Sequence, residues 1–405
     1  MLARTVAVFA FAYFVSYIFR VVNAVAGPSL IADIGIDAAA LGLLTSTYFL
    51  TFAAAQVPLG VALDRYGPRR VESILFVVAA AGALTFALAN DLTTLIIGRG
   101  LIGLGVSAAL MASFKAYSMV VPPKKLHTVT GVHMAAGGLG ALAAGAPSEW
   151  AINVIGWRGL FVVLAALCLV AAAAIALFGP RWHGGPKGES IARQIRAIGQ
   201  VILDPLFLRV MAFCVPSQAT ALATQGLWAG PWLRDVQGLE PGAAATVLSL
   251  MAVSMAAGYL AIGAIAQRAQ ARHVHMFAVP VTCMTLYMVA QAGVIFLPPE
   301  FGAVMWCIGT FFATSGILLF PVLASLYPSA MSGRVNTMQN FLVFIASFAV
   351  QWLIGVALDA LSPGIGVANA YGIAFGVLLA LQAIGLALIL IRMPAHPPEP
   401  QSAGS

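Results

Sequence analysis

The stretch Gly60-Val-Ala-Leu-Asp64-Arg65-Tyr-Gly67-Pro-Arg69-Arg70-Val71 separates two long apolar runs. A degraded copy of it, Gly263-Ala-Ile-Ala-Gln267-Arg268-Ala-Gln270-Ala-Arg272-His273-Val274, begins 203 residues later. The same offset aligns residues 26–30 with residues 229–233, and Asp37 with Glu240. A constant offset over such a distance indicates an internal repeat, and we expect two copies of one unit of about 200 residues.

The composition places both copies in a membrane. The chain is 61% hydrophobic and 8% charged, with a mean hydropathy of +0.98, whereas soluble domains contain about 25% charged residues. So few charges cannot cover a surface that faces water, and the sequence therefore predicts an integral membrane protein. The cysteines lie inside apolar runs without metal-ligand spacing, so we expect neither disulfides nor a metal site.

Twelve apolar stretches are long enough to cross a bilayer as helices, which takes about 20 residues each. None of them alternates with the period of a barrel strand. We therefore expect an all-α membrane fold with six spanning helices in each copy. The expected helices cover residues 5–31, 40–63, 71–90, 93–120, 127–151, 159–179, 208–232, 243–263, 274–297, 302–326, 333–358 and 369–391.

The basic residues predict the orientation. Fifteen of the 20 Lys and Arg residues fall on segments expected on the same side of the membrane as the amino terminus. The segments on the opposite side contain two, Arg158 and Arg234. Because loops rich in Lys and Arg stay in the cytoplasm, both termini are expected on the cytoplasmic side. The protein is expected to lie in the cell inner membrane. The same distribution accounts for the net charge of +7 without a nucleic-acid partner, since the basic segments lack interleaved aromatic residues.

The expected domains follow from the repeat. Residues 1–180 form an N-terminal six-helix bundle, residues 181–207 a cytoplasmic linker, residues 208–393 a C-terminal six-helix bundle, and residues 394–405 a disordered tail. The linker contains an amphipathic pattern at Ile191, Ile195, Ile198 and Ile202. This segment is either a solvated linker that connects the two halves or a helix that lies on the membrane surface.

Three motifs resemble those of the major facilitator superfamily. They are Gly-x-x-x-Asp-Arg-x-Gly-x-Arg-Arg after the second helix, Arg99 with Gly103 and Gly105 in the fourth, and Gly156-Trp157-Arg158 before the sixth. The resemblance implies two bundles that rock about a central site, so that a solute is carried by alternating access. The first motif would then act as a latch that stabilises one conformational state. Alternatively, its basic residues only determine the orientation of the helices in the membrane. Its residues are Gly60, Asp64, Arg65, Gly67, Arg69 and Arg70.

Three basic residues lie inside predicted helices: Arg20, Arg99 and Lys115. Charges within a membrane are costly and are usually functional. The acids Glu72, Glu149 and Asp359 lie near helix ends instead. A fixed positive interior without a counter-ion favours an anionic substrate.

Arg20 is the strongest candidate for the anion contact. It shares a helical stripe with Tyr17 and Asn23, and a guanidinium can hold a carboxylate with two hydrogen bonds. The alternative is a structural arginine bonded to a neighbouring helix. The first helix, from Arg20 to Pro28, also resembles that of the anion:cation symporters, in which an arginine contacts the substrate carboxylate. Phe19 and Val106 stand where that group has carboxylates, so its proton coupling is not carried over.

The remaining candidates have less support. Gln225 and Trp228 in the seventh helix are expected to supply neutral contacts, and Lys115 is either a second anion contact or a snorkelling side chain. Arg99 and His133 are interpreted as structural or proton-linked. The eleventh helix carries a polar stripe that we expect to support the site rather than line it: Asn336, Asn340, Ser347 and Gln351.

These features predict a secondary transporter for a small organic anion, with a carboxylate as the first expectation, carried alone or together with a proton or cation. One alternative is an exporter of drug-like or metal-chelating compounds. Another, of a different class, is a membrane sensor that binds a solute without moving it. No nucleophile with a base and no phosphate loop is found in the sequence, so we expect no enzyme and no cofactor. The protein is expected to be monomeric in the bilayer.

Overall fold

The computed structural model describes residues 2–181, 203–327 and 329–391, and at 57, 64, 123–128 and 329–334 it describes the backbone alone. These residues form helices throughout, without a strand in the described part of the chain. Eleven helices are long and apolar enough to span a membrane, and Val129–Ala143 is a shorter apolar one. Large apolar side chains such as Trp150 and Leu260 are more than two-thirds exposed, as lipid-facing positions require. The expected all-α membrane fold is therefore confirmed.

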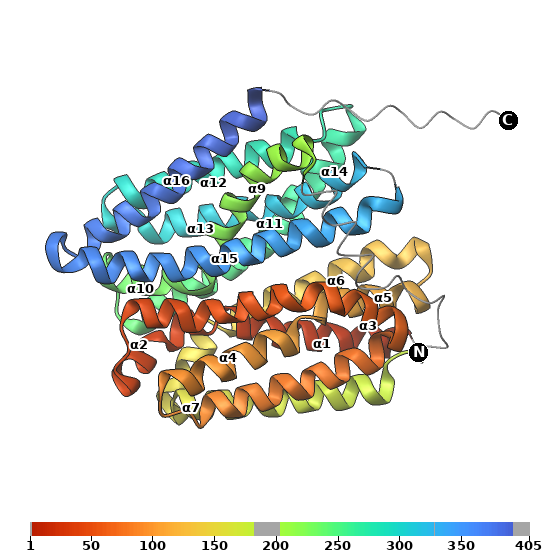
Figure 1. Cartoon of the computed structure of the whole chain (residues 1–405), viewed down its shortest axis with the longest axis horizontal. Helices are drawn as coiled ribbons and strands as arrows, with labels where there is room; N and C mark the ends of the chain where they lie inside the picture. The colour runs from red at the N-terminus through yellow and green to blue at the C-terminus, as the bar shows by residue number, and fades with distance from the viewer. Residues whose placement is uncertain (1, 182–202, 328, 392–405) are drawn as a thin grey trace.

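Two groups of helices lie one above the other in Figure 1. The lower group is the first half of the chain: α1 (Leu2–Val21), α2 (Asn23–Ile34), α3 (Ala38–Ala87), α4 (Leu92–Val106), α5 (Ala109–Val120), α6 (Pro123–Ala143) and α7 (Ala146–Phe178). The upper group is the second half: α9 (Pro205–Ala223), η1 (Thr224–Trp228), α10 (Ala229–Asp235), α11 (Pro241–Ala271), α12 (Ala278–Phe296), η2 (Pro299–Phe301), α13 (Gly302–Ala313), η3 (Thr314–Leu318), α14 (Leu319–Ser325), α15 (Ser329–Ile365) and α16 (Val367–Ile391). Residues 182–202 of the linker expected at 181–207, and the whole tail expected at 394–405, lie outside the described residues.

Two expected boundaries differ from the structure. Residues 64–70 were expected to form a loop, but α3 runs through them and changes direction at Gly67 alone, whose φ is +79°. A left-handed backbone favours glycine, and Pro68 with its fixed φ begins the next helix. The fifth helix was expected to continue to residue 151, whereas α6 ends at Ala143 and α7 turns at Gly156, with φ +73°.

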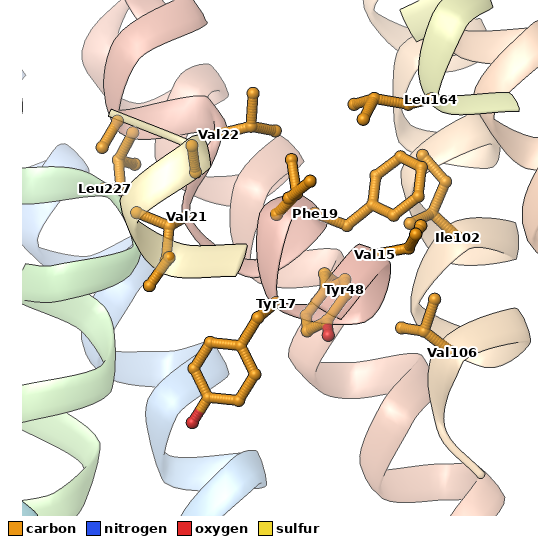
Figure 2. Close-up of a cluster of buried hydrophobic side chains, with 14 of the residues drawn as sticks. Val15, Tyr17, Phe19, Val21, Val22, Tyr48, Ile102, Val106, Leu164 and Leu227 are labelled. Atoms are coloured by element: carbon orange, nitrogen blue, oxygen red, sulfur yellow. The ribbon is translucent and has the colours of Figure 1, made fainter. Parts of the chain in front are cut away.

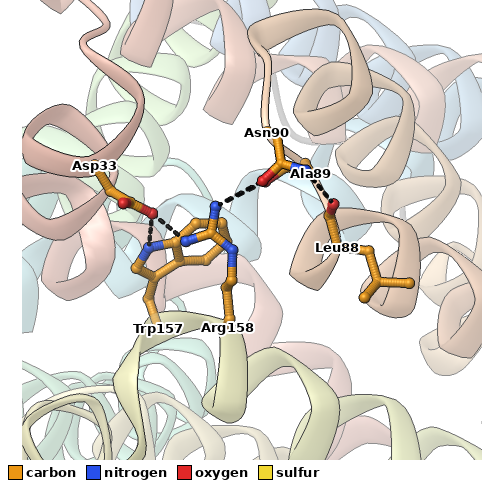
Figure 3. A network of polar contacts seen from close by, with 6 residues as sticks. All are labelled: Asp33, Leu88, Ala89, Asn90, Trp157 and Arg158. Atoms are coloured by element: carbon orange, nitrogen blue, oxygen red, sulfur yellow. Dashed lines mark hydrogen bonds and ion pairs between the residues drawn. The ribbon is translucent and has the colours of Figure 1, made fainter.

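A polar network holds one end of the first half together (Figure 3). The indole N–H of Trp157 donates to Asp33 Oδ2 at 3.1 Å, and Arg158 forms an ion pair with the same carboxylate. The Nη2 of Arg158 also donates to the carbonyl of Ala89 at 3.0 Å. The Gly156-Trp157-Arg158 motif therefore ties α7 to the end of α2 and to the turn between α3 and α4. The Arg158 and Trp157 hydrogen bonds lower the pKa of Asp33.

The two halves meet most closely along α3 and α15. Gly42 lies against the backbone of Gln351, and Gly355 lies against that of Ala38. Asp359 accepts hydrogen bonds from the backbone N–H groups of Ala38, at 3.1 Å, and Ala39, at 2.6 Å. These contacts join the halves, as does the bond from the Ala146 N–H to Ser249 Oγ, at 2.8 Å.

Candidate functional site

Arg20 occupies the last turn of α1, at the boundary between the halves. Its guanidinium carbon lies 4.6 Å from the ring centre of Tyr17, 5.6 Å from that of Phe52 and 5.7 Å from that of Phe344. Phe52 belongs to α3 and Phe344 to α15, so both halves contribute rings. The Nε of Arg20 is buried and has no hydrogen-bond partner among the described residues. A cation held against aromatic faces with an unused donor can accept an anion without first breaking an ion pair.

A second buried arginine lies on the far side of Tyr48. The ring of Tyr48 lies 4.9 Å from the Arg99 guanidinium carbon, and both residues are fully buried. The Tyr48 hydroxyl and two nitrogens of Arg99 have no hydrogen-bond partner in the described part of the chain. Figure 2 shows Tyr48 beside α1, and the Tyr17 hydroxyl pointing away from the apolar cluster of Phe19 and Ile102. Arg99 is thus a buried charge without a described counter-ion.

The second half approaches Arg20 through η1 and α15. A Cβ placed on Gly226 of the π-helical η1 segment would lie 3.4 Å from the Arg20 carbonyl oxygen and 3.6 Å from Gln351 Nε2. Both polar atoms of the Gln351 side chain are buried without a described partner. The polar stripe of the eleventh helix therefore reaches the site at Gln351. The polar stripe is visible in the sequence, but whether Gln351 lies near Arg20 depends on how α15 packs against the first half.

The neutral residues predicted as ligands are Gln225, Trp228 and Asn23, and each of them already donates a hydrogen bond within the protein. Gln225 donates to Met255 Sδ at 3.0 Å and lines a cavity of about 50 Å³ that also contacts Tyr259. Trp228 is fully buried, and its indole N–H donates to the Gln351 carbonyl at 2.9 Å. Asn23 donates to Thr45 Oγ1 at 3.0 Å, which leaves its own carbonyl oxygen without a described partner. Trp228 therefore presents no unused donor in this conformation.

His133 lies beside the Arg20 site rather than in it. Its Nδ1 lies 3.0 Å from the Tyr117 hydroxyl, and its ring stacks on Tyr13 with centres 4.3 Å apart. Lys115 is half-buried on α5, near the end of the helix that is remote from Arg99. Arg20 and Tyr17 thus lie at the boundary between the halves. Gln225 lines a cavity formed by residues of the second half, and Lys115 lies in the first half.

The motif at residues 60–71 is exposed in part. Arg65 and Arg70 are exposed, and Arg69 is half-buried. Gly60 has open space where a side chain would be. The side chain of Asp64 lies outside the described residues, so the latch stays a prediction.

The rings of Tyr17, Phe52 and Phe344 lie within 6 Å of the Arg20 guanidinium carbon and form an apolar wall beside it. Low local polarity strengthens a charge-assisted hydrogen bond to an anion. The described side chains contain no cluster of three His, Cys, Asp or Glu that could hold a metal ion. An anion that reached the buried Nε of Arg20 could accept a hydrogen bond from it.

Comparison with known proteins supports a transport class. The chain is 27% identical over 157 residues to the probable sulfoacetate transporter SauU of Cupriavidus necator, and the match covers 39% of this chain and 36% of that protein. A multidrug resistance protein B homolog of Mycobacterium tuberculosis is 30% identical over 44% of this chain and 33% of its own length. The chain thus spans about a third of the length of these curated relatives. The inner membrane transport protein YdhP of Escherichia coli K12 is 25% identical over 91% of this chain and 90% of its own length.

A solved structure has the same fold. It is a bacterial homolog of the human lysosomal transporter Spinster, in an inward-facing and unoccupied conformation, with a TM-score of 0.77. The two chains are 17% identical, and the alignment covers 96% of each. The family model described as Major Facilitator Superfamily matches residues 9–351. This chain belongs to the Major Facilitator Superfamily.

Proposed function

We propose that the protein carries a small organic anion across the inner membrane by alternating access, and that Arg20 is the contact for its anionic group. The observation that carries this proposal is the buried, unpaired Nε of Arg20 between rings contributed by both halves. A binding site at the boundary between the halves is one that each half can expose in turn. Arg99 and its unpaired nitrogens add positive charge behind Tyr48.

The proposal includes an orientation and a conformational state. With both termini in the cytoplasm, the Asp359 end faces outward. The hydrogen bonds between the halves then close the outer side, and the state is inward-facing. We further propose that the protein acts as a monomer and that the residues of the first motif, with Asp64, latch the opposite state. The relative named as a probable sulfoacetate transporter supports an anion as cargo.

Thermal stabilisation of the purified protein by a panel of small anions, sulfoacetate included, tests the Arg20 contact. A ligand at about 100 times its Kd stabilises the folded state by about 2.7 kcal/mol, so one anion should raise the melting temperature of the wild type. Arg20→Ala should weaken its binding about 30-fold or more, because losing one partner of a desolvated charge pair costs about 2–5 kcal/mol. Arg20→Lys should lose most of the gain as well, because a lysine cannot form the planar fork.

Arg4→Ala is the matched control, because Arg4 lies on the same helix but is exposed at its start. It should keep the full response. Counterflow of the stabilising anion in proteoliposomes then separates a carrier from a sensor that binds without transport. Stabilisation that survives in Arg20→Ala would show that the anion binds elsewhere.

Export of drug-like compounds is the second candidate. The multidrug resistance relative and the aromatic wall around Arg20 favour it. In that case lipophilic compounds, and none of the small anions, would stabilise the protein.

A further inference from the structure

Arg99 is a buried cation without a described partner. Its side chain has an exposed fraction of 0%, and its Nε and Nη1 find no hydrogen-bond acceptor among the described residues. The Tyr48 ring covers its guanidinium, and the Tyr48 hydroxyl is also buried without a described partner. Buried polar atoms in native proteins are nearly always paired, so three such atoms at one place require an explanation.

The packing of α4 on α3 keeps Glu72 away from Arg99. The part of α3 after Gly67 runs antiparallel to α4, and Gly105 of α4 lies against Ala79 of α3. Arg99 is six residues from this contact in one direction, and Glu72 is seven residues from it in the other. At a rise of about 1.5 Å per residue, the two positions are about 20 Å apart along the bundle. Glu72 therefore does not neutralise Arg99.

The other described carboxylates of the first half are not bonded to Arg99 either. Asp33 accepts hydrogen bonds from α7, and Asp37 and Asp91 accept them from the first turns of α3 and α4. No described carboxylate, Glu149 included, forms an ion pair or a hydrogen bond with Arg99. The part of the chain that the structure describes thus supplies no bonded counter-ion for this charge.

Tyr48 stands between the two buried arginines. Asn23 donates to Thr45 Oγ1 at 3.0 Å, which fixes the register of α2 against the antiparallel α3. Three residues back from Asn23 is Arg20, and three residues on from Thr45 is Tyr48, so the two lie at about the same level. Phe52, one turn further along α3, lies 6.0 Å from the Tyr48 ring and 5.6 Å from the Arg20 guanidinium carbon. A ligand that bonds to Arg20 therefore lies within about one helical turn of Tyr48.

We propose that this site takes a dianion, a short organic acid with two acidic groups. Arg20 binds one group, and the Tyr48 hydroxyl and Arg99 receive the other. This inference rests on the proposed function, because it narrows the organic anion of that same site to a class with two negative charges. A buried charge without a partner is costly. A monoanion leaves one of the two arginines unpaired, whereas a dianion pairs both.

The second acidic group gains its bonds without breaking any that the protein already makes. The Tyr48 hydroxyl donates to it, and Arg99 supplies the opposite charge together with two unused N–H donors. Hydrogen bonds to charged groups are stronger than those between neutral groups, and a surrounding of low polarity strengthens them further. The arrangement therefore favours a second negative charge over a neutral polar group of the same shape.

Matched pairs of small acids test the second charge. Malonate, succinate, glutarate and sulfoacetate each carry two acidic groups, and the monoamide of each replaces a carboxylate by a neutral amide of nearly the same shape. The dissociation constants follow from the dependence of the melting temperature on ligand concentration. In the wild type, at least one dianion should bind about 30-fold or more tightly than its monoamide, because the monoamide leaves one buried arginine unpaired.

Tyr48→Phe removes the hydroxyl alone, and no described hydrogen bond is lost with it. Its preference for the dianion over the monoamide should fall about fivefold, because a hydrogen bond to a charged group is worth more than one to a neutral amide. Tyr66→Phe makes the same change at an exposed tyrosine of α3 and should keep the full preference. A preference that is equal in Tyr48→Phe and the wild type overturns the contact.

Arg99→Met separates a ligand contact from a structural role, because methionine fills the same space without a charge. Removal of an unpaired buried charge should leave the melting temperature of the unliganded protein unchanged or higher. The preference for the dianion should shrink to about threefold or less. An arginine with a structural role predicts the opposite, a lower melting temperature with the preference kept. An unchanged preference in Arg99→Met overturns the role of Arg99.

The wild-type measurements distinguish failure of this inference from failure of the proposed function. Equal binding of the dianions and their monoamides overturns the dianion site and leaves Arg20 as the contact for a single acidic group. No stabilisation by any of these anions contradicts the proposed function, and the dianion site with it.

Discussion

At the scale of single residues, the ion pair of Arg158 with Asp33 shows how one residue of α7 connects that helix to α2 and to the turn between α3 and α4. The carboxylate accepts from both Trp157 and Arg158, and Arg158 also holds the carbonyl of Ala89. These bonds favour the ionised form, which is why the pKa of Asp33 is lowered. Exposed ion pairs alone contribute little, so the effect depends on the shared network.

Asp33→Asn should lower the melting temperature at neutral pH, because an amide cannot form the ion pair. Since the pKa of Asp33 is lowered in the folded state, its stabilisation is present above the ordinary aspartate pKa and is lost as the pH falls through the lowered pKa. The difference between wild type and Asp33→Asn should therefore shrink in acid. Melting curves over a pH series measure it. Glu240→Gln removes an exposed charge without a side-chain capping bond and should show no such trend; a constant difference for Asp33→Asn would contradict the assignment.

At the scale of helices, small residues decide how closely α1 packs on α6. A Cβ on Gly140 would lie 2.9 Å from Tyr17 Cβ and 3.1 Å from the carbonyl carbon of Phe14. Backbone atoms cannot yield as a flexible side chain does. Close approach at small residues is the usual way in which membrane helices associate. The contact positions Tyr17, and with it the wall of the Arg20 site.

Gly140→Ala should destabilise the protein by about 1–3 kcal/mol, the usual cost of an overpacked core, and should weaken anion binding through displacement of Tyr17. Gly131 on the same helix has no atom within 4 Å of the position that an added methyl group would take. Gly131→Ala should therefore be neutral or stabilising by up to about 1 kcal/mol, because alanine favours helix. Thermal unfolding of the two variants compares them directly. Equal behaviour would show that the α1–α6 contact adapts without cost.

At the scale of the whole molecule, Asp359 joins the two halves. Its carboxylate accepts from Ala38 and Ala39 at the start of α3, where the helix dipole favours a negative charge. Asp37, one residue before the helix, accepts from Ala40 within the same half. Only the first interaction has to break when this end of the molecule opens.

Asp359→Asn should shift the protein toward the state that is open at this end. A charge at a helix terminus is worth about 0.3–1 kcal/mol, which changes the ratio of the two states by up to about fivefold. Spin labels at Ile31 and Ser362, which line the cavity at this end, would report longer distances. Asp37→Asn, the control, should leave the distances unchanged.

Asp64→Asn should shift the same distances the opposite way if the first motif latches the other state. An unchanged distance distribution in Asp64→Asn would contradict the latch.

Much of the candidate site was predictable from residue types. Arg20 stands out because a charge inside an apolar helix has few other uses, and Tyr17 because it lies one turn away. Phe52, Tyr48 and Phe344 carry no such signal, since an aromatic residue in a membrane helix usually faces lipid or core.

The sequence by itself determined the membrane fold and the family, because hydropathy and motif spacing are properties of the chain itself. The twofold repeat stays a prediction. Only the tertiary structure decided that rings from α3 and α15 lie against Arg20 and that Asp359 binds the start of α3. Each of these depends on helices that are distant in sequence, and packing between such helices follows from shape rather than from any local pattern.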